Sequence, residues 1–388
     1  MLIKTMPESM ISPTSAREDR GIFGDGRGVR FSMENLEFSV PYNNDPETLE
    51  ELFKLKRLGN NKIAEVYLSG PQEYSGSGRI VPEIDINEFI ELVDRIHKEE
   101  LRVNLILNST CEGSDWYSQK VVNSTMEYLR QVHEEHGVEA ITIANPLYIS
   151  KVRERFPDIE ICASVLGNID CVQRAVIYRK AGADIITPDV NINRNLGLLK
   201  EIKEATNAKL KLLVNEGCLY KCPFRQFHFN AKSHVSKEVS KAGIDVSFAD
   251  FFGAGTQVIR EDLSQLLKSC WIRPEDIRRY AEITTYFKLV CRAQLRSFVI
   301  RAARAYLEES WDGDLLDLVS GCSKRFSINE GAYLDNKSLG KYRFFEMVTT
   351  CDNRCGQCGY CEDLSEKLIE LGVYTPEKGE DVPSFVRG

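Results

Sequence analysis

Short apolar runs alternate with amphipathic stretches between about residue 37 and residue 290. The apolar runs are continuously hydrophobic, as expected of parallel strands that are buried on both faces. The stretches between them repeat apolar residues at helical spacing, which predicts a helix after most strands. We expect eight strands: LEFSVPY (36–42), AEVYLSG (64–70), VNLILNST (103–110), AITIANP (140–146), EICASVL (160–166), ADIITPD (183–189), KLKLLVNEG (209–217) and KSCWIRPED (268–276).

Eight strand-and-helix units over this length predict an α/β fold, a TIM-like (β/α)8 barrel. A doubly wound open sheet is the alternative, but no GxGxxG follows the first strand, so its dinucleotide-binding form gains no support. We expect an irregular N-terminal segment over 1–36, the barrel over 37–290, and a helical extension with a cysteine cluster over 291–388. The last stretch before the extension, IRRYAEITTYFKLV (277–290), reads as a helix.

The ends of the predicted strands carry small polar side chains. Strand C-termini line the active-site face of a TIM barrel, so these residues are candidates for a substrate site. For Ser164 and Asn195, capping of the following helix is an equally good explanation. Glu216 has no obvious capping role, because two cysteines follow it closely. The candidates are Ser69, Asn108, Asn145, Ser164, Asp189, Asn215, Glu216 and Arg273.

The composition narrows the function classes. The formal net charge is −8, which argues against a protein that coats nucleic acid by bulk charge. No apolar run approaches the roughly 20 residues of a membrane span, and the N-terminal sequence lacks an apolar signal core. We therefore expect a cytoplasmic protein that does not enter the membrane. In that reducing compartment the twelve cysteines should be thiols or metal ligands.

Four cysteines cluster near the C-terminus in CDNRCGQCGYC: Cys351, Cys355, Cys358 and Cys361. Glycines between them let several thiolates converge, and soft thiolates select zinc or an iron–sulfur cluster. Structural zinc usually uses two pairs separated by a longer loop, so a 4Fe–4S cluster is favoured and zinc is the alternative. The first three cysteines match the spacing of radical SAM enzymes, but no barrel can follow the motif here. By contrast, Cys162 and Cys171 lie in or beside apolar segments and read as small core residues.

Three further cysteines lie near the last two predicted strands: Cys218 and Cys222 come at the end of the seventh, and Cys270 comes at the start of the eighth. They suggest a second iron–sulfur site at the barrel mouth, and the chain would then hold one or two clusters. The fourth ligand stays open between Cys111, Cys322, His228, His234, a member of the C-terminal group and a free coordination position. A buried strand cysteine is the alternative explanation of Cys270.

VNEGCLYKCPFRQFHFN and CWIRPEDI, on an eight-strand pattern, resemble peptidase family U32. The resemblance covers roughly residues 37–290. It implies a TIM-like barrel that holds a 4Fe–4S cluster on four cysteines, with Cys218, Cys222 and Cys270 as the first, second and fourth. The chain departs from the family pattern in two ways. Its first two cysteines have three residues between them rather than six, and no third cysteine lies between 222 and 270.

Despite their name, the better-understood members of that family are oxygen-independent hydroxylases, which act in anaerobic ubiquinone synthesis and on RNA bases. In several of them prephenate is implicated as oxygen donor, and some work with a partner subunit. We therefore predict an iron–sulfur-dependent hydroxylase, or a related redox-modifying enzyme, for a small organic molecule or an RNA base. Glu216 would serve as acid or base and Arg273 would bind a substrate carboxylate. Asp189 and His228 complete the predicted catalytic set.

Two other function classes remain open. One is a U32-type peptidase or hydrolase, although the sequence has no HExxH, no GxSxG and no clear serine, histidine and aspartate set. The other is a zinc-stabilised scaffold without catalysis.

Overall fold

The computed structural model describes residues 34–74, 76–237, 255, 257–290, 292–321 and 332–371. By its internal contacts the chain divides into a unit 1–31 and a unit 32–388, and every described residue belongs to the second. Cys291 and Cys322 lie outside the described residues.

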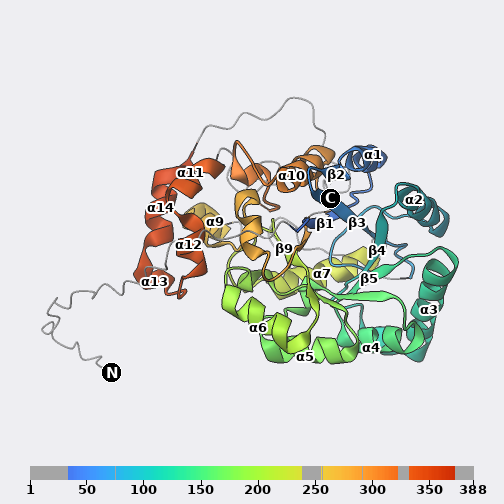
Figure 1. Cartoon of the computed structure of the whole chain (residues 1–388). Coiled ribbons are helices and arrows are strands. Elements are labelled where there is room, and N and C mark those ends of the chain that lie inside the picture. Colours follow the sequence, from blue (N-terminus) through green and yellow to red (C-terminus); the bar gives the residue numbers. More distant parts are fainter. Residues whose placement is uncertain are drawn as a thin grey trace, which may run out of the picture. The chain divides into compact units, whose positions relative to one another are not determined.

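A ring of parallel strands forms the centre of the second unit (Figure 1). The ring order is β1, β3, β4, β5, β6, β7, then β8 and β9, then β10 beside β1. β8 and β9 are two halves of one stretch interrupted only at Lys211, and this stretch closes the ring. The predicted TIM-like barrel is thus confirmed. Its strands are β1 (Glu37–Pro41), β3 (Asn61–Ser69), β4 (Arg102–Leu107), β5 (Ala140–Ile143), β6 (Glu160–Ala163), β7 (Ile185–Ile186), β8 (Lys209–Leu210), β9 (Leu212–Leu213) and β10 (Tyr286–Lys288).

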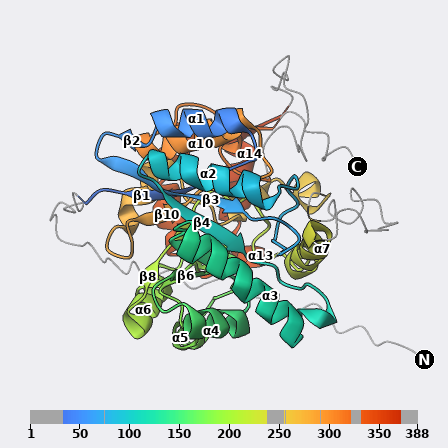
Figure 2. The same cartoon turned by 90° about the vertical axis from the view of Figure 1, so that its right-hand side faces the viewer.

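Helices surround the strands, and each buries one apolar face against them (Figures 1 and 2). α2 illustrates how the sequence sets the bounds. Asp85 accepts hydrogen bonds from the backbone N–H groups of Asn87 and Glu88, and Glu88 bonds back to the Asp85 N–H, so the helix begins with a capping box. The outer helices are α1 (Pro46–Lys54), α2 (Ile86–Lys98), α3 (Gln119–Arg130), α4 (Pro146–Arg155), α5 (Val172–Ala181), α6 (Leu196–Thr206) and α10 (Arg296–Glu308).

The eighth strand lies elsewhere than predicted. Residues 268–276 form no strand. Their backbone contacts strand seven through a hydrogen bond from the Ile272 N–H to the Val214 carbonyl, and a 3-10 helix, η5 (Pro274–Tyr280), follows. The strand is instead β10, inside the stretch read as a helix. β-Branched and aromatic residues favour a strand there. Phe287 packs into the outer core, whereas Tyr286 and Lys288 face the barrel interior.

α10 acts as the eighth barrel helix, because it follows β10 directly and lies beside α1 in both cartoon views (Figures 1 and 2). Its residues Val299, Ala303 and Tyr306 belong to the main core. The barrel therefore extends to Glu308, beyond the boundary expected at residue 290.

A polar layer fills the lower barrel interior. Glu65 and Lys211 form an ion pair of 2.6 Å, with 0% and 1% of their side-chain surfaces exposed. Ser39 and Asn104 donate hydrogen bonds of 2.5 Å and 3.0 Å to the same carboxylate oxygen. Burial alone would raise the pKa of Glu65, but Lys211 and the hydrogen bond from Ser39 hold it at about 2. Cys162, predicted as a core residue, is fully buried in this layer.

A second hydrophobic core joins the C-terminal extension to the segment between strands seven and eight. The Trp271 ring stacks on Phe344 with ring centroids 5.2 Å apart, and Leu219, Leu267 and Leu364 belong to the same core. The extension is therefore built onto the barrel. Its elements, with α9 of the crossover, are α9 (Ser264–Lys268), η6 (Leu315–Asp317), β11 (Tyr333–Leu334), α11 (Asn336–Lys341), α12 (Phe344–Thr349), α13 (Cys355–Cys358), α14 (Tyr360–Leu368) and β12 (Ile369–Glu370).

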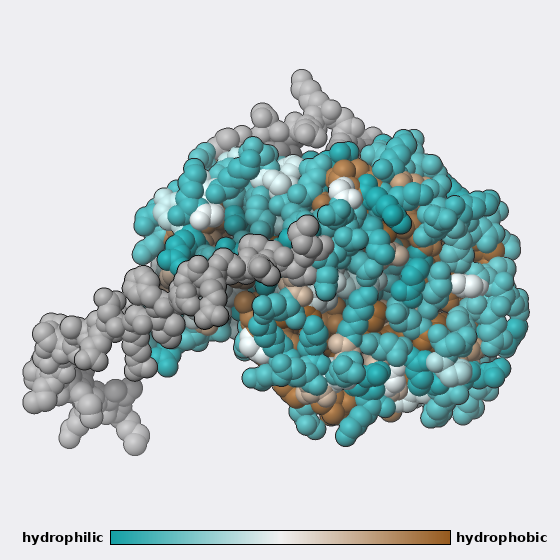
Figure 3. All heavy atoms as spheres, in the orientation of Figure 1, coloured by the Kyte–Doolittle hydropathy of each residue, from teal (hydrophilic) through white to brown (hydrophobic). Residues whose placement is uncertain are grey.

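The face in Figure 3 is mostly hydrophilic, and hydrophobic residues appear there in small separate patches. Among the described residues, no helix has the length and apolar character needed to cross a membrane. One predicted core residue is on the surface: Cys171 is exposed, because it occupies the N-cap position of α5 and not a packed face.

Candidate functional site

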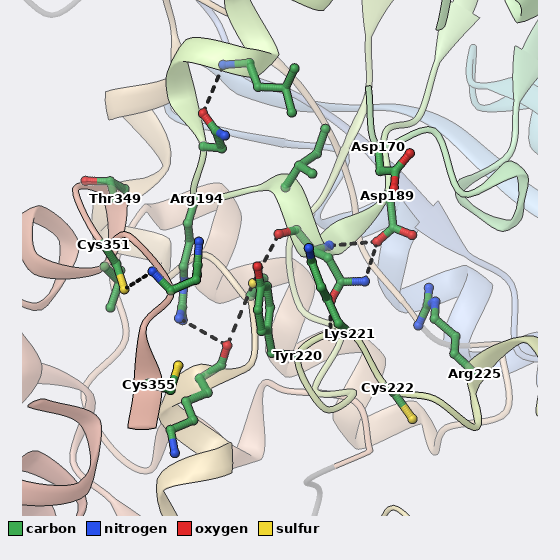
Figure 4. A pocket seen from close by; sticks show the side chains of 18 of the residues that line it. Asp170, Asp189, Arg194, Tyr220, Lys221, Cys222, Arg225, Thr349, Cys351 and Cys355 are labelled. Atoms are coloured by element: carbon green, nitrogen blue, oxygen red, sulfur yellow. Dashed lines mark hydrogen bonds between the residues drawn. The ribbon is translucent and has the colours of Figure 1, made fainter. Parts of the chain in front are cut away.

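A cavity of about 650 Å³ lies where the extension meets the C-terminal ends of the barrel strands (Figure 4). Its lining comes from the segments after β6 and β7, from the segment after β9 with the end of α9, and from the loops around α12 and α13. Five thiols line it, and we call it the cysteine cavity. They are Cys222, Cys270, Cys351, Cys355 and Cys361.

All five of these cysteines are free thiols. Burial raises the pKa of Cys270, and it raises that of Cys361 to about 11; the nearby Arg194 cation opposes both shifts. Burial also raises the pKa of Tyr220, and the neighbouring sulfurs of Cys270 and Cys355 add to that shift. The sulfurs from the barrel side and from the extension therefore share one electrostatic environment.

Cys222 differs from the other thiols because its pKa falls to about 6. The first cause is a hydrogen bond from Cys218, and the backbone N–H groups of Phe224 and Arg225 donate to the same sulfur. The pKa of Cys218 rises in return, because its proton is held in this bond. Cys218 does not line the cysteine cavity, but its hydrogen bond to Cys222 connects it to a residue that does.

Arg194 is the cation that links the two sides of the cavity. Its guanidinium lies 5.2 Å from the ring centroids of both Trp271 and Phe344. Nη1 donates a 2.8 Å hydrogen bond to the Leu267 carbonyl, while Nη2 is buried without a partner among the described residues. Figure 4 shows Arg194 and Tyr220 between Cys351 and Cys355 on one side and Cys222 on the other.

The thiols of the cysteine cavity are the right ligand type for a soft metal centre, but their positions in the structure do not form one. Thiolates hold zinc and iron–sulfur clusters, and five thiols with a compensating cation meet that requirement chemically. Within the part of the chain that the structure describes, however, no three Cys, His, Asp or Glu side chains converge at metal-binding distance. Cys351 and Cys358 are exposed, so the 351–361 segment would have to close for its thiolates to meet.

A second, smaller cavity of about 60 Å³ lies inside the barrel mouth. We call it the barrel-mouth cavity. Glu216 lines it and forms a two-bond ion pair with Arg225, which includes a 3.1 Å contact between Nη2 and Oε2. Burial would raise the pKa of Glu216, but Arg225 lowers it below its usual range. Its lining residues include Tyr67, Arg79, Asn108, Ser164, Glu216, Lys288 and Arg292.

The predicted catalytic residues are not brought together. Asp189 lines the cysteine cavity and caps η4 (Val190–Ile192) by accepting a 2.8 Å bond from the Asn191 N–H. Glu216 lines the barrel-mouth cavity instead. His228 belongs to α7 (Arg225–Lys237) and lines neither cavity. Its ring stacks on that of Phe224, with ring centroids 6.0 Å apart.

Arg273 also lies away from both cavities. Its Nε donates to Asp276 at 2.7 Å, and its Nη1 donates to the Asn336 carbonyl at 2.9 Å. These bonds fix α11 to the barrel. Because they occupy the guanidinium, Arg273 does not serve as the predicted binding group for a substrate carboxylate. Cys358 is exposed and does not line the cysteine cavity.

The capping explanation holds for several strand-end residues. Asn145 and Asn195 accept bonds from backbone N–H groups at the starts of α4 and α6. Ser164 caps the short η3 (Val165–Gly167) and also lines the barrel-mouth cavity.

Sequence reasoning missed the cations of both cavities. Arg194, Lys221 and Lys268 line the cysteine cavity. Arg79 and Lys288 line the barrel-mouth cavity. For Lys288 a signal was present, since a lysine inside the apolar run TYFKLV has no solvent face if the run is a buried strand. For Arg194 the sequence held no comparable signal, because its partners Trp271 and Phe344 are far away in the chain.

Comparisons with known proteins find a match to one family model and similarity to individual proteins. A family model described as peptidase family U32 matches residues 50–219. The chain is 29% identical over 343 residues to an uncharacterized protease of Methanocaldococcus jannaschii, an alignment that covers 86% of this chain and 99% of the relative. A solved U32 peptidase is 20% identical with a TM-score of 0.49, covering 69% of this chain and 96% of that one. A chitinase of Rhizomucor miehei is 9% identical with a TM-score of 0.37, covering 70% and 99%. Of the candidate metal ligands, Cys218 and Cys111, one of the candidates for the fourth ligand, lie within the matched residues of the family model.

Proposed function

The chain belongs to peptidase family U32, and from that premise we propose that it is an iron–sulfur-dependent redox-modifying enzyme of the oxygen-independent hydroxylase type. The observation that supports this proposal is the cysteine cavity. Thiols from the barrel, Cys222 and Cys270, line the same cavity as thiols from the extension, Cys351, Cys355 and Cys361. A packing role would not explain why two distant segments direct five thiols to one cavity at the strand ends.

The residues that would hold a 4Fe–4S cluster are drawn from these five thiols. When bound, such a cluster supplies one-electron transfer or an iron position for an oxygen-bearing group. Arg194 and Lys268 lower the pKa of Cys361 against the effect of burial, so they favour the thiolate form that a metal requires. Zinc on the same thiolates is the structural alternative.

The rest of the cavity suits a small polar substrate. Its volume falls within the range of ordinary ligand pockets. Lys221 and Arg194 would attract an anionic group such as a carboxylate of prephenate, the expected oxygen donor. Asp189 is held in place by two bonds from Asn191, of 2.8 Å and 2.7 Å, and would orient a substrate hydroxyl or ammonium group.

The family name alone does not favour peptidase chemistry here. A Cys–His peptidase needs an imidazole beside the reactive thiolate. His97 and His133 pair with Glu139 and Asp158, and none of the residues that line the cysteine cavity is a histidine. The proposed redox enzyme and a peptidase differ in metal content, which makes metal analysis the decisive measurement.

The test is anaerobic purification followed by iron, sulfide and zinc analysis of the full chain and of single variants. We expect a brown protein with about four irons per cluster. Cys355→Ser and Cys361→Ser should lose most of the iron, whereas Cys171→Ser, at an exposed cysteine away from the cavity, should keep it. One zinc and no iron would replace the redox proposal with the scaffold. Peptide cleavage by a metal-free, colourless protein would replace it with the peptidase.

A further inference from the structure

Lys288 stands out as a buried amine without a counter-ion. Its residue is 8% exposed, and its Nζ lies 3.8 Å from the centroid of the Tyr67 ring. Among the described residues no carboxylate and no hydrogen-bond acceptor contacts Nζ. Glu65, whose charge acts on the Lys288 amine, is already paired with Lys211. A buried lysine normally has a partner of opposite charge, so a bound ligand would explain the burial of this amine.

The amine borders the barrel-mouth cavity, which has room for a few waters or a small molecule. Lys288 is the last residue of β10, and in a TIM barrel the inward side chains at strand ends meet the substrate. Across the cavity Glu216 is neutralised by Arg225, so it does not supply a counter-ion to the amine.

The cavity also offers a place for a carboxylate. Arg79 lies with its guanidinium 5.2 Å from the Phe229 ring centroid, and among the described residues no acceptor contacts the N–H groups of that guanidinium. The loop that carries Arg79 is held down by a 2.9 Å bond from the Gly78 N–H to Asn108 Oδ1. A side chain on Gly78 would come within 2.3 Å of Leu166, so the loop fits closely on the barrel. Arg292, which lines the same cavity, adds a second cation.

We propose that the barrel-mouth cavity is a second reactive site, in which the Lys288 amine captures the carbonyl carbon of a small 2-oxo acid as an iminium adduct. Arg79 and Arg292 would hold the carboxylate next to that carbonyl. This site lies apart from the cysteine cavity and does not depend on the metal proposed there.

The step balances without a redox partner. The nitrogen lone pair forms the new C–N bond, and the carbonyl oxygen becomes a hydroxyl as one proton moves from nitrogen to oxygen. One further proton from solvent lets that hydroxyl leave as water. The sum is amine, carbonyl compound and one proton giving iminium ion and water. The new cation is placed over the Tyr67 ring, as the protonated amine is.

The amine is set up to be neutral near pH 7. Burial lowers the pKa of Lys288 to about 7, and the cation of Lys211 is the second cause. An ordinary lysine with a pKa of about 10.4 is only about 0.04% neutral at that pH. The titratable and charged groups that face Lys288 from the surrounding strands and loops are Glu65, Tyr67, Arg79, Cys162, Lys211, Glu216, Tyr286 and Arg292.

The test is reductive trapping of the full-length protein with pyruvate and sodium cyanoborohydride, followed by peptide mapping. We expect one reduced pyruvyl group per chain at Lys288, added at least about tenfold faster than at any surface lysine because of the difference in neutral fraction. The rate should rise between pH 6 and pH 8, since only the deprotonated amine attacks. Label spread evenly over surface lysines, or none at Lys288, would overturn the proposal without any variant.

Three variants locate the effect. Lys288→Met should abolish the fast label and keep the metal content of the parent, which separates this site from the cysteine cavity. Lys209→Arg, at an exposed strand lysine, should label like the parent. Arg79→Gln should slow trapping of pyruvate about tenfold but leave trapping of the uncharged ketone acetone unchanged. Equal slowing of both probes would contradict a carboxylate role for Arg79.

Discussion

The ion pair between Glu65 and Lys211 shows how a single residue can carry stability in this barrel. Both side chains are almost fully buried, and their contact is 2.6 Å. Loss of one partner leaves the other charge buried and unpaired, which typically costs about 3–5 kcal/mol. We expect Lys211→Met to lower the Tm by roughly 5–10 °C, because about 1 kcal/mol corresponds to a few degrees in proteins of this size class.

Two comparisons identify the cause of that loss. Lys209→Met, at the exposed residue that begins the same stretch, should change the Tm little, since exposed pairs contribute about 0–1 kcal/mol. The double variant Glu65→Leu with Lys211→Met should regain much of the lost stability, because it removes both charges. A double variant less stable than Lys211→Met would point to packing rather than to the unpaired carboxylate.

At the residue scale, the predicted metal ligands stay predictions, but the structure places most of them at one cavity. Five of the seven proposed metal ligands line one cavity, as expected from thiols at strand ends and in a compact motif. Arg273 was placed at a strand end, but its guanidinium is used by Asp276 and Asn336. That use depends on a helix more than sixty residues later, which no local pattern reveals.

At the element scale, the packing of α12 on the barrel controls the approach of the extension to the cysteine cavity. Phe344, which begins this helix, is 2% exposed and stacks on Trp271, and Arg194 lies over both rings. Truncation of a buried phenylalanine typically costs about 3–5 kcal/mol. We expect Phe344→Ala to open the extension locally, with earlier proteolytic cleavage between α12 and α14 and a lower metal content.

Tyr342→Ala is the matched control, because Tyr342 is 44% exposed and only two residues away. It should leave both the cleavage pattern and the metal content as in the parent. If Phe344→Ala instead accelerated cleavage throughout the barrel helices, the extension and the barrel would unfold as one cooperative unit.

The strands show where sequence patterns suffice and where they fail. The first seven predicted strands all contain strand residues, because each is an apolar run between clear turn signals. The prediction of the eighth strand was wrong. Residues 277–290 contain the end of a 3-10 helix followed by a short strand, and the apolar residues of the two together have the spacing of one helix. β10 also carries Lys288 inward, so its hydrophobic pattern is interrupted at the position with the most distinctive chemistry.

At the scale of the whole molecule, the extension forms hydrogen bonds with the strand ends of the barrel and is part of the same packed structure. The side chain of Asn215 at the end of strand seven donates to the carbonyls of Val290 and Leu318, at 3.1 Å and 2.9 Å. The Gly217 N–H donates to the Ser320 carbonyl at 2.8 Å, and Ser320 donates back to Asn215. The strand ends around both cavities are therefore fixed by residues beyond the barrel.

Removal of residues 311–388 should consequently destabilise the barrel itself. The truncation would leave buried backbone and side-chain groups at Asn215, Gly217 and Arg273 without partners, each at a cost of about 1–3 kcal/mol. It would also expose the apolar side chains of Leu267 and Trp271, which belong to the second core. We expect an insoluble or aggregated product, measured as soluble yield and thermal melting by circular dichroism.

Deletion of residues 1–31, which form a separate unit, is the control and should leave the melting curve of the remaining chain close to that of the parent. A soluble 1–310 fragment with a cooperative, parent-like transition would show that the barrel folds alone and that the extension only lines the cysteine cavity.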